Sequence, residues 1–202
     1  MKKLEKLTEE QIQLMSQTRD EWINRFFSFK EIDKKAFEDG VKWLYEDLLG
    51  KKNPKIIYCD SWIEACKIMV GASVRDSVWA YSGYLSTYSN YGWSSFYDYF
   101  EKIGVLRHDQ FKKYKKLINS GVFQAYEYED VVIAIQPPTT ILKDEEGRMN
   151  SITQKAFEWS NGDGFYYVNG FELKEDLFLK LKNKELTLED FLKEESEEVK
   201  SP

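Results

Sequence analysis

Apolar side chains recur every three or four positions through the first 120 residues of the chain, which is the spacing of helices with one buried face. The first helix is predicted over residues 7–29, where Thr8 and Gln11 have the spacing of a capping box. Arg19 interrupts its apolar stripe and either extends into solvent or points into a site. The stripe that we expect to be buried consists of Ile12, Met15, Trp22, Ile23, Phe26 and Phe27.

The same spacing continues in later segments. A second helix is predicted over 33–50, with Asp33 as N-cap and Gly50 just after its end. Its expected buried face is Phe37, Val41, Leu44 and Leu48. The run "KIIYC", residues 55–59, predicts a strand. Further helices are predicted over 61–70, from Trp93 to about Gly104, and over 108–121.

After Gly121 the period changes from helical to that of strands. "VFQAYEY" is rich in strand-forming residues, and "VVIAI" is apolar throughout, as in a strand buried on both faces. Short strands follow up to about Leu173, and Asn161-Gly162 and Asn169-Gly170 are expected to form type I′ hairpin turns. A last helix is predicted from Thr187, ending in an acidic tail.

This order predicts an α+β fold. It has an N-terminal helical part with one strand, followed by a C-terminal antiparallel β meander and a terminal helix. We expect a single domain over 1–202. The change of period suggests a subdomain boundary near 121, between a mainly helical part, 1–120, and a part comprising the meander and the C-terminal helix, 121–202.

Composition narrows the classes of partner. The chain has 202 residues, 42% of them hydrophobic, and a formal charge of −6. A net negative charge disfavours nucleic acid and anionic membranes as partners. Two cysteines cannot form a disulfide framework, the N-terminus lacks a secretion signal, and no apolar run is long enough for a membrane helix. We therefore expect a cytoplasmic protein.

Known catalytic motifs are missing from the sequence. It has no phosphate-binding loop, no dinucleotide-binding glycine motif, no zinc-protease motif and no nucleophile elbow. His108 is the only histidine and lies among charged residues at a helix start. The sequence thus predicts no metal and no cofactor, and it favours binding over catalysis.

One stretch, Tyr81–Phe100, concentrates aromatic rings: six of the thirteen tyrosines lie in it. Trp93, Phe96 and Phe100 recur at helical spacing, which predicts a buried, structural role. The loop tyrosines are interleaved with Ser, Gly, Thr and Asn, the composition of binding loops, although partial burial would also explain them. They are Tyr81, Tyr84, Tyr88 and Tyr91.

A second candidate site is the strand-to-helix turn at "IIYCDSW". A helix N-terminus there would direct N–H groups at an anion and lower the pKa of Cys59 if its thiol faced the turn. The simpler interpretation is that Asp60 and Ser61 are ordinary caps and Cys59 is a buried apolar residue.

Two charged groups also admit an ordinary interpretation. The lysines around Tyr114 could contact nucleic acid, but their pattern is that of a solvated helix face. Asp98 and Glu101 lie three apart on one helix, without a partner cluster that would indicate a metal or acid–base chemistry. The lysines are Lys112, Lys113, Lys115 and Lys116.

Several segments, in this order, resemble a bacterial family that is catalogued as a domain of unknown function. They are "CDS", "YGWSSFYDYFEKIGVL", "INSG", "DEEGRMN", "AFEWSNGDGFYYVNGFEL" and "LTLEDFLKEESEEV", and the resemblance covers roughly residues 8–200. In that family the hairpin region carries a histidine and a "DGPA" segment. Here Asn150 and "ITQKA" take their places. The resemblance implies a compact intracellular domain and no particular reaction.

The sequence therefore favours a binding module for a protein partner or a small anionic ligand, such as a mobile-element accessory or inhibitor. Its expected binding residues are Asp60, Ser61, Arg75, Tyr84, Tyr88, Tyr91 and Trp93. The alternative is an enzyme acting on a phosphorylated or nucleotide-like substrate at the Asp60-Ser61 turn. In that case Arg75 or Arg148 would assist, and Asp60 would be the polar catalyst. Binding of nucleic acid through the lysines is a third hypothesis.

Overall fold

A computed structural model describes residues 6–71, 87–187 and 190, with the backbone alone at 70–71 and 87–89. The chain divides into two compact units, Met1–Pro137 and Pro138–Pro202, which are considered one at a time. The division falls after the third strand, whereas the change of period in the sequence falls near Gly121. The expectation of a single domain stays a prediction.

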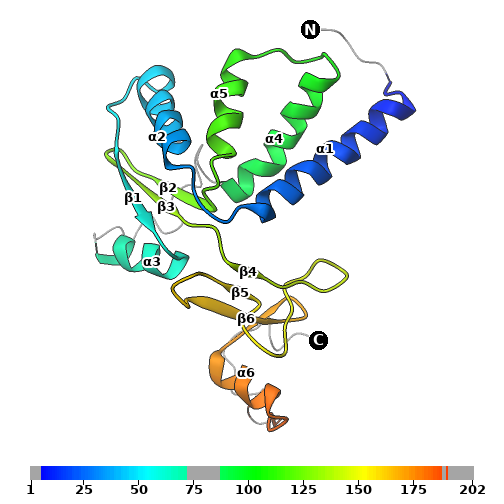
Figure 1. The fold of residues 1–202 in the computed structure, drawn as a ribbon, viewed down its shortest axis with the longest axis vertical. Helices are drawn as coiled ribbons and strands as arrows, with labels where there is room; N and C mark the ends of the chain where they lie inside the picture. The colour runs from blue at the N-terminus through cyan, green and yellow to red at the C-terminus, as the bar shows by residue number, and fades with distance from the viewer. Residues whose placement is uncertain (1–5, 72–86, 188–189, 191–202) are drawn as a thin grey trace. The chain divides into compact units, whose positions relative to one another are not determined.

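Unit 1 combines helices with a small sheet (Figure 1). Its helices are α1 (Glu9–Ser28), α2 (Lys34–Lys42), the π-helical segment η1 (Trp43–Leu48), α3 (Trp62–Gly71), α4 (Thr87–Lys102) and α5 (Asp109–Ile118). Its strands are β1 (Lys55–Cys59), β2 (Gln124–Glu127) and β3 (Val131–Ile135). None of the helices in the described ranges combines the length and the apolar character needed to cross a membrane.

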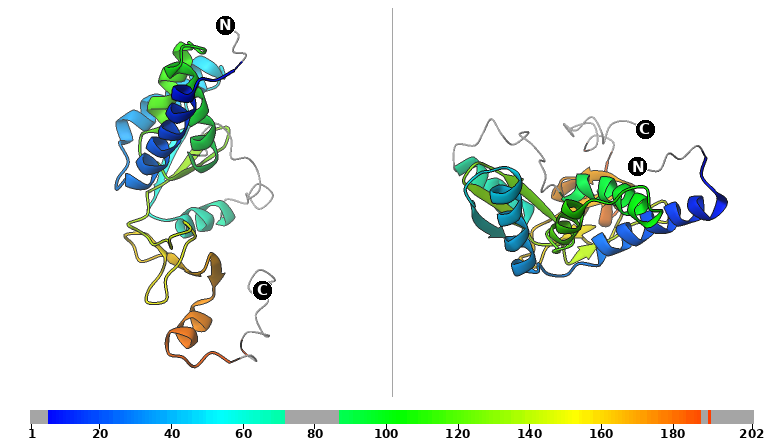
Figure 2. Two further views of the ribbon diagram at one scale, coloured as in Figure 1. Left: turned by 90° about the vertical axis from the view of Figure 1, so that its right-hand side faces the viewer. Right: turned by 90° about the horizontal axis from the view of Figure 1, so that it is seen from above.

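Helix α1 begins as predicted, and its predicted buried face is correct only in part. Thr8 and Gln11 form a complete capping box. The buried residues are Thr18, Trp22 and Phe26, whereas Ile12 and Ile23 are about half exposed. Figures 1 and 2 show that α1 runs beside α4, and the two helices are in contact. The prediction is confirmed for Trp22 and Phe26 and was wrong for Ile12 and Ile23, because polar groups of α1 bond to α4 and hydrophobic spacing does not register such bonds. Arg19 is exposed and pairs with Asp20.

Helix α2 continues into the π-helical turn η1, where the Leu49 N–H donates to the Leu44 carbonyl at 3.0 Å, five residues back. The wider turn places three consecutive side chains, Trp43, Leu44 and Tyr45, in the interior. It also rotates Leu48 outward to 47% exposure, so the prediction that Leu48 is buried was wrong. Phe37, Val41 and Leu44 are buried as predicted.

Strand β3 is the centre of the sheet in unit 1, which has the order β1-β3-β2. Four of its five residues are buried, as "VVIAI" predicts. It pairs antiparallel with β2 and parallel with β1, in the register Lys55↔Val131 to Cys59↔Ile135. This sheet is therefore mixed. The parallel pair is possible because the long connection between β1 and β3 provides the crossover that such pairs require.

Helices α2 and α5 pack closely on the sheet. Buried residues from α2, η1, α5, β2 and β3 form one apolar cluster. At Gly40 a Cβ atom would lie 2.6 Å from the Leu117 side chain, so only glycine allows α5 to approach α2 this closely. This contact brings η1 and α5 together, which places the two sides of the pocket described below.

Unit 2 is an antiparallel sheet with a helix. Its elements are β4 (Thr140–Ile141), β5 (Phe157–Glu158), β6 (Gly164–Val168), β7 (Phe171–Leu173) and α6 (Glu175–Lys182). Asn169 and Gly170 both have positive φ, which confirms a type I′ turn between β6 and β7. The prediction of a type I′ turn at Asn161-Gly162 was wrong. Only Gly162 has positive φ, because a longer loop joins β5 to β6, in which the Trp159 N–H donates to the Asp163 carbonyl at 2.8 Å.

The strand and helix order confirms the α+β class, with N-terminal helices, a later antiparallel sheet and a terminal helix. Helix α6 lies just before the predicted last helix. Thr187 and Asp190 exchange two backbone-to-side-chain hydrogen bonds, as at a capped helix start. The rest of the segment predicted from Thr187 onward lies outside the described residues.

Candidate functional site

Helix α4 has an interior face and an exposed face, and both carry aromatic residues. Trp93, Phe96 and Phe100 are 67%, 49% and 36% exposed, so the prediction that they form the core was wrong. Tyr97, between them, is also exposed. The helix begins at Thr87, so residues 87–91 are helical where a loop was predicted.

The interior face of α4 carries Tyr91, Ser94, Asp98 and Tyr99. The Tyr91 ring packs against Trp22, with centroids 4.8 Å apart, and its hydroxyl donates to Asn119 Oδ1 at 2.8 Å. The prediction that Tyr91 is an at least partly exposed loop residue was therefore wrong. Burial raises the pKa of Tyr91. Its polar end finds a partner inside the protein, which is why a tyrosine can occupy this buried position.

Asp98 links three helices. Its carboxylate accepts hydrogen bonds from Trp22 Nε1 at 2.9 Å and from Lys115 Nζ, and Lys102 Nζ lies 3.7 Å away. Burial by itself would raise the pKa of Asp98. The hydrogen bonds from Lys115 and Trp22, with the charges of Lys115 and Lys102, outweigh this effect and hold its pKa below the usual value. Asp98 thus holds α1, α4 and α5 together in the ionised state.

A pocket of about 590 Å³ lies on unit 1 between η1, α4 and α5. Its wall from η1 is Trp43, Leu44 and Leu48, and its wall from α4 is Asn90, Trp93, Ser94 and Tyr97. Leu106, His108, Gln110, Phe111 and Tyr114 complete it. Five of these twelve side chains are Trp, Tyr or Phe. The volume and the lining are those of pockets that take small molecules.

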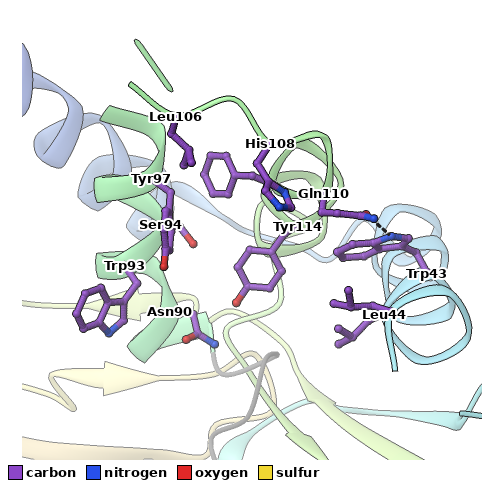
Figure 3. A pocket seen from close by; sticks show the side chains of 12 residues that line it. Trp43, Leu44, Asn90, Trp93, Ser94, Tyr97, Leu106, His108, Gln110 and Tyr114 are labelled. Atoms are coloured by element: carbon purple, nitrogen blue, oxygen red, sulfur yellow. Dashed lines mark hydrogen bonds between the residues drawn. The ribbon is translucent and has the colours of Figure 1, made fainter. Parts of the chain in front are cut away.

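A hydrogen bond and a contact between two rings join the sides of this pocket (Figure 3). Trp43 Nε1 donates to Gln110 Oε1 at 3.1 Å, which ties η1 to α5. The rings of Tyr97 and Phe111 lie 5.7 Å apart and join α4 to α5. In Figure 3 the Tyr114 ring and the Asn90 side chain point toward one another across the pocket. The walls therefore come from three elements that are bonded to one another.

The lining of the pocket carries no aspartate, glutamate, lysine or arginine among the residues that the structure describes. Lys113 Nζ lies 5.8 Å from the centre of the Trp43 ring and 3.7 Å from Asp47 Oδ2, so a carboxylate already balances this cation. Burial, with the charges of Glu127 and Tyr97, raises the pKa of Tyr114, whose hydroxyl therefore stays neutral. The interior of the pocket favours an uncharged group.

Ser94 contributes an unpaired hydroxyl to the pocket wall. The residue is 1% exposed, and its Oγ has no hydrogen-bond partner among the described residues. The next serine, Ser95, behaves as helical serines usually do, donating to the Gly92 carbonyl at 2.7 Å. Figure 3 shows Ser94 on the side of α4 that faces Tyr114.

The β1–α3 turn is a capped helix start. Ser61 Oγ accepts from the Glu64 N–H at 3.0 Å, and Glu64 Oε2 accepts from the Asp60 N–H at 2.7 Å. A carboxylate of the protein thus already lies at the N-terminus of α3. Burial, followed by the charges of Glu64 and Asp60, raises the pKa of Cys59 to about 11, which is opposite to the direction expected for an activated thiol.

The predicted site residues are not brought together by the described structure. Trp93 lines the pocket, whereas Asp60 and Ser61 do not. Arg75 and Tyr84 lie outside the described residues, and for Tyr88 only the backbone in α4 is described. Arg148 lies in unit 2, where it pairs with Asp144 at 2.7 Å and Glu146 at 2.9 Å.

Most of the pocket was not identifiable from the sequence. The hydrophobic period assigns Leu44, Phe111 and Tyr114 to the core, and nothing in the pattern distinguishes a core position from a pocket wall.

Among the described residues no group of three His, Cys, Asp or Glu side chains could hold a metal ion. Comparisons with protein-family models, curated proteins and solved structures find no match to this chain.

Proposed function

We propose that this protein is a binding module whose pocket between η1, α4 and α5 takes up a small, uncharged ligand. The observation that carries this proposal is the pocket itself. It is concave, about 590 Å³ in volume, lined mainly by aromatic and aliphatic side chains, and held open by contacts between three elements. Such a lining with a few polar groups is typical of ligand sites.

Binding without catalysis fits the chemistry of the lining. His108 is the only histidine in the pocket wall, and no carboxylate, cysteine or lysine lies beside it there among the residues that the structure describes. The polar groups of Asn90 and Gln110 are amides, which orient ligands by hydrogen bonding but do not transfer protons. The wall therefore offers recognition and no acid–base pair.

The alternative, an enzyme acting on a phosphorylated substrate at the Asp60-Ser61 turn, has less support. Glu64 already accepts a hydrogen bond at the N-terminus of α3. A bound phosphate there would have to displace this carboxylate or lie beside it, and two like charges at close range repel one another. A small anionic ligand at this turn is disfavoured for the same reason.

Nucleic acid is not the main partner in this proposal. Of the four lysines on α5, Lys115 bonds to Asp98, Lys112 lies 3.7 Å from Asp109, and Lys113 lies 3.7 Å from Asp47. These neighbouring carboxylates reduce the positive field that a phosphate backbone would need. We also place the protein in the cytoplasm, since Cys59 and Cys66 are free thiols, as in a reducing compartment.

The proposal can be tested with a library of neutral fragments and nuclear magnetic resonance of the folded protein. Ligands should shift the signal of the Trp43 indole N–H, which lies in the pocket wall. Leu48→Trp should weaken binding about tenfold or more, because the larger ring enters the pocket from its rim. The matched control is Ile23→Trp, on the exposed side of α1, since Ile23 and Leu48 are 46% and 47% exposed.

The control variant should bind like the wild type. The proposal fails if no fragment shifts the Trp43 signal, or if both tryptophan variants weaken binding equally.

A further inference from the structure

The pocket wall shows which class of ligand it would take, and this inference rests on the proposed function. Aromatic side chains stand on every side of the pocket: Trp43 on η1, Tyr97 on α4, and Phe111 and Tyr114 on α5. Aromatic rings attract one another in offset and edge-to-face arrangements beyond the energy of simple burial. A planar aromatic ligand gains these contacts, whereas a saturated ligand of equal size does not.

The lack of charged side chains in the described part of the pocket wall disfavours a charged ligand. No ionised carboxylate, lysine or arginine lines the wall in the described part of the chain. Lys113, whose Nζ lies 5.8 Å from the centre of the Trp43 ring, lies beside Asp47. An anion or cation that entered would lose its hydration without gaining a partner of opposite charge.

Ser94 supplies the remaining selectivity. A buried hydroxyl without a hydrogen-bond partner is unfavourable, and native proteins rarely keep one without a reason. Ser95 on the same helix satisfies its hydroxyl with a backbone carbonyl, the partner that helical serines often take. Ser94 lines the pocket and lacks this bond. A serine hydroxyl reorients about a single bond, so the Ser94 hydroxyl can form its missing hydrogen bond with a polar group on the ligand.

We infer that the pocket binds a neutral, planar aromatic molecule that carries one hydrogen-bonding group, which pairs with the Ser94 hydroxyl. The rings of the pocket wall provide the apolar contacts, and Ser94 fixes the orientation of the ligand. The unpaired hydroxyl is a cost to the free protein that the bound ligand removes.

Four probes of similar size separate these features: 2-naphthol, naphthalene, 2-decalol and 2-naphthoate. Titrations followed by the Trp43 indole signal give the affinity of each. We expect 2-naphthol to bind at least tenfold more tightly than the saturated 2-decalol and the charged 2-naphthoate. Tighter binding of either of the latter two would overturn the inference, while binding in the pocket would still support the proposed function.

Ser94→Ala tests the hydrogen bond. It should weaken the binding of 2-naphthol by roughly two- to tenfold, the range for one neutral hydrogen bond. The affinity for naphthalene should change by no more than about twofold. In the free protein it should raise the melting temperature or leave it unchanged, because it removes an unpaired polar group. The matched control, Ser95→Ala, should leave both affinities unchanged.

Two further results would contradict the inference. Equal weakening of 2-naphthol and naphthalene by Ser94→Ala would show that the hydroxyl shapes the wall but does not bind. The inference would also be overturned if none of the four probes shifted the Trp43 indole signal. The proposed function would fail as well only if its own test failed, that is, if no fragment of the wider library shifted the Trp43 signal or if Leu48→Trp and Ile23→Trp weakened binding equally.

Discussion

Tyr91 and Trp93 lie two residues apart on α4 and have opposite environments. Tyr91 is 6% exposed and packs against Trp22 and Phe26, with ring centroids 4.8 and 5.0 Å away. Trp93 is 67% exposed, and its ring lies against Phe96, which is also exposed. At the residue scale, therefore, the large rings of this helix do two different jobs, and the size of a ring does not show which.

This contrast predicts different costs for two matched substitutions. Tyr91→Ala should lower the free energy of unfolding by about 3–5 kcal/mol, since it removes a large buried ring and leaves a cavity. Trp93→Ala should lower it by less than about 1 kcal/mol, because little of the ring is removed from water. Urea denaturation of both variants gives the measurement. Similar losses for the two would mean that Trp93 is part of the core.

Helices α1, α4 and α5 are held together by a polar centre, Asp98, as well as by apolar contacts. The side chain of Asp98 is 5% exposed, while those of Lys102 and Lys115 are 31% and 32% exposed. Lys102 extends the network to Glu21 at 2.7 Å and to Thr18 at 3.1 Å on α1. At the scale of the elements, this network determines which face of each helix is buried.

Asp98→Ala should lower the free energy of unfolding by about 3 kcal/mol, at the low end of the range for breaking a buried pair, because the lysines keep some contact with water. The control is Asp39→Asn, in the exposed pair of Asp39 with Lys35, which should leave the free energy of unfolding close to that of the wild type. Comparable losses for both would mean that Asp98 contributes no more than a surface charge.

The lowered pKa of Asp98 also predicts a dependence on pH. A carboxyl group whose pKa is lower in the folded state stabilises the fold above its unfolded pKa, about 3.9, and this contribution disappears as the pH falls through the folded pKa. The stability of the wild type should therefore fall below about pH 4. Asp98→Asn should be less stable at neutral pH and lose less on acidification, as urea denaturation at several pH values would show. Parallel curves for the two proteins would contradict this.

At the scale of the whole molecule, the pocket and both helix contacts that form it belong to unit 1. The central strand β3 belongs to the same unit, since it pairs with β1 on one side and β2 on the other. Removing β3 would leave β1 without its partner and uncover the buried residues of α2 and α5 that pack on the sheet. Unit 1 therefore depends on residues that follow the change of period at Gly121.

Two fragments test this dependence. Residues 1–137 should unfold cooperatively in urea and keep the binding of the ligands that shift Trp43. Residues 1–121, which end where the sequence changes from helical to strand spacing, should lack a cooperative transition. Circular dichroism recorded during a urea titration of each fragment shows whether it unfolds cooperatively. If the shorter fragment unfolds as cooperatively as the longer one, the division near Gly121 is the correct boundary and the one after Pro137 is not.

The sequence by itself determined the features that depend on neighbouring residues. The capping box at Thr8, the N-cap at Asp33, the apolar strand 131–135 and the turn at Asn169-Gly170 are all present as predicted. Each depends on local backbone geometry or on burial of a whole segment. The α+β class follows from the order of these segments.

Only the tertiary structure decided which helix faces are buried and where the pocket lies. Helical spacing marks Trp93, Phe96 and Phe100 as one face, but it does not show whether a partner covers that face. The buried face instead carries Tyr91, Ser94 and Asp98, because Trp22 on α1, Lys115 on α5 and Asn119 just after α5 bond to two of these polar groups. Such bonds join residues that are distant in the chain, so no local pattern contains them. The pocket is set in the same way, by the π turn at Trp43 and the close contact of α2 with α5 at Gly40.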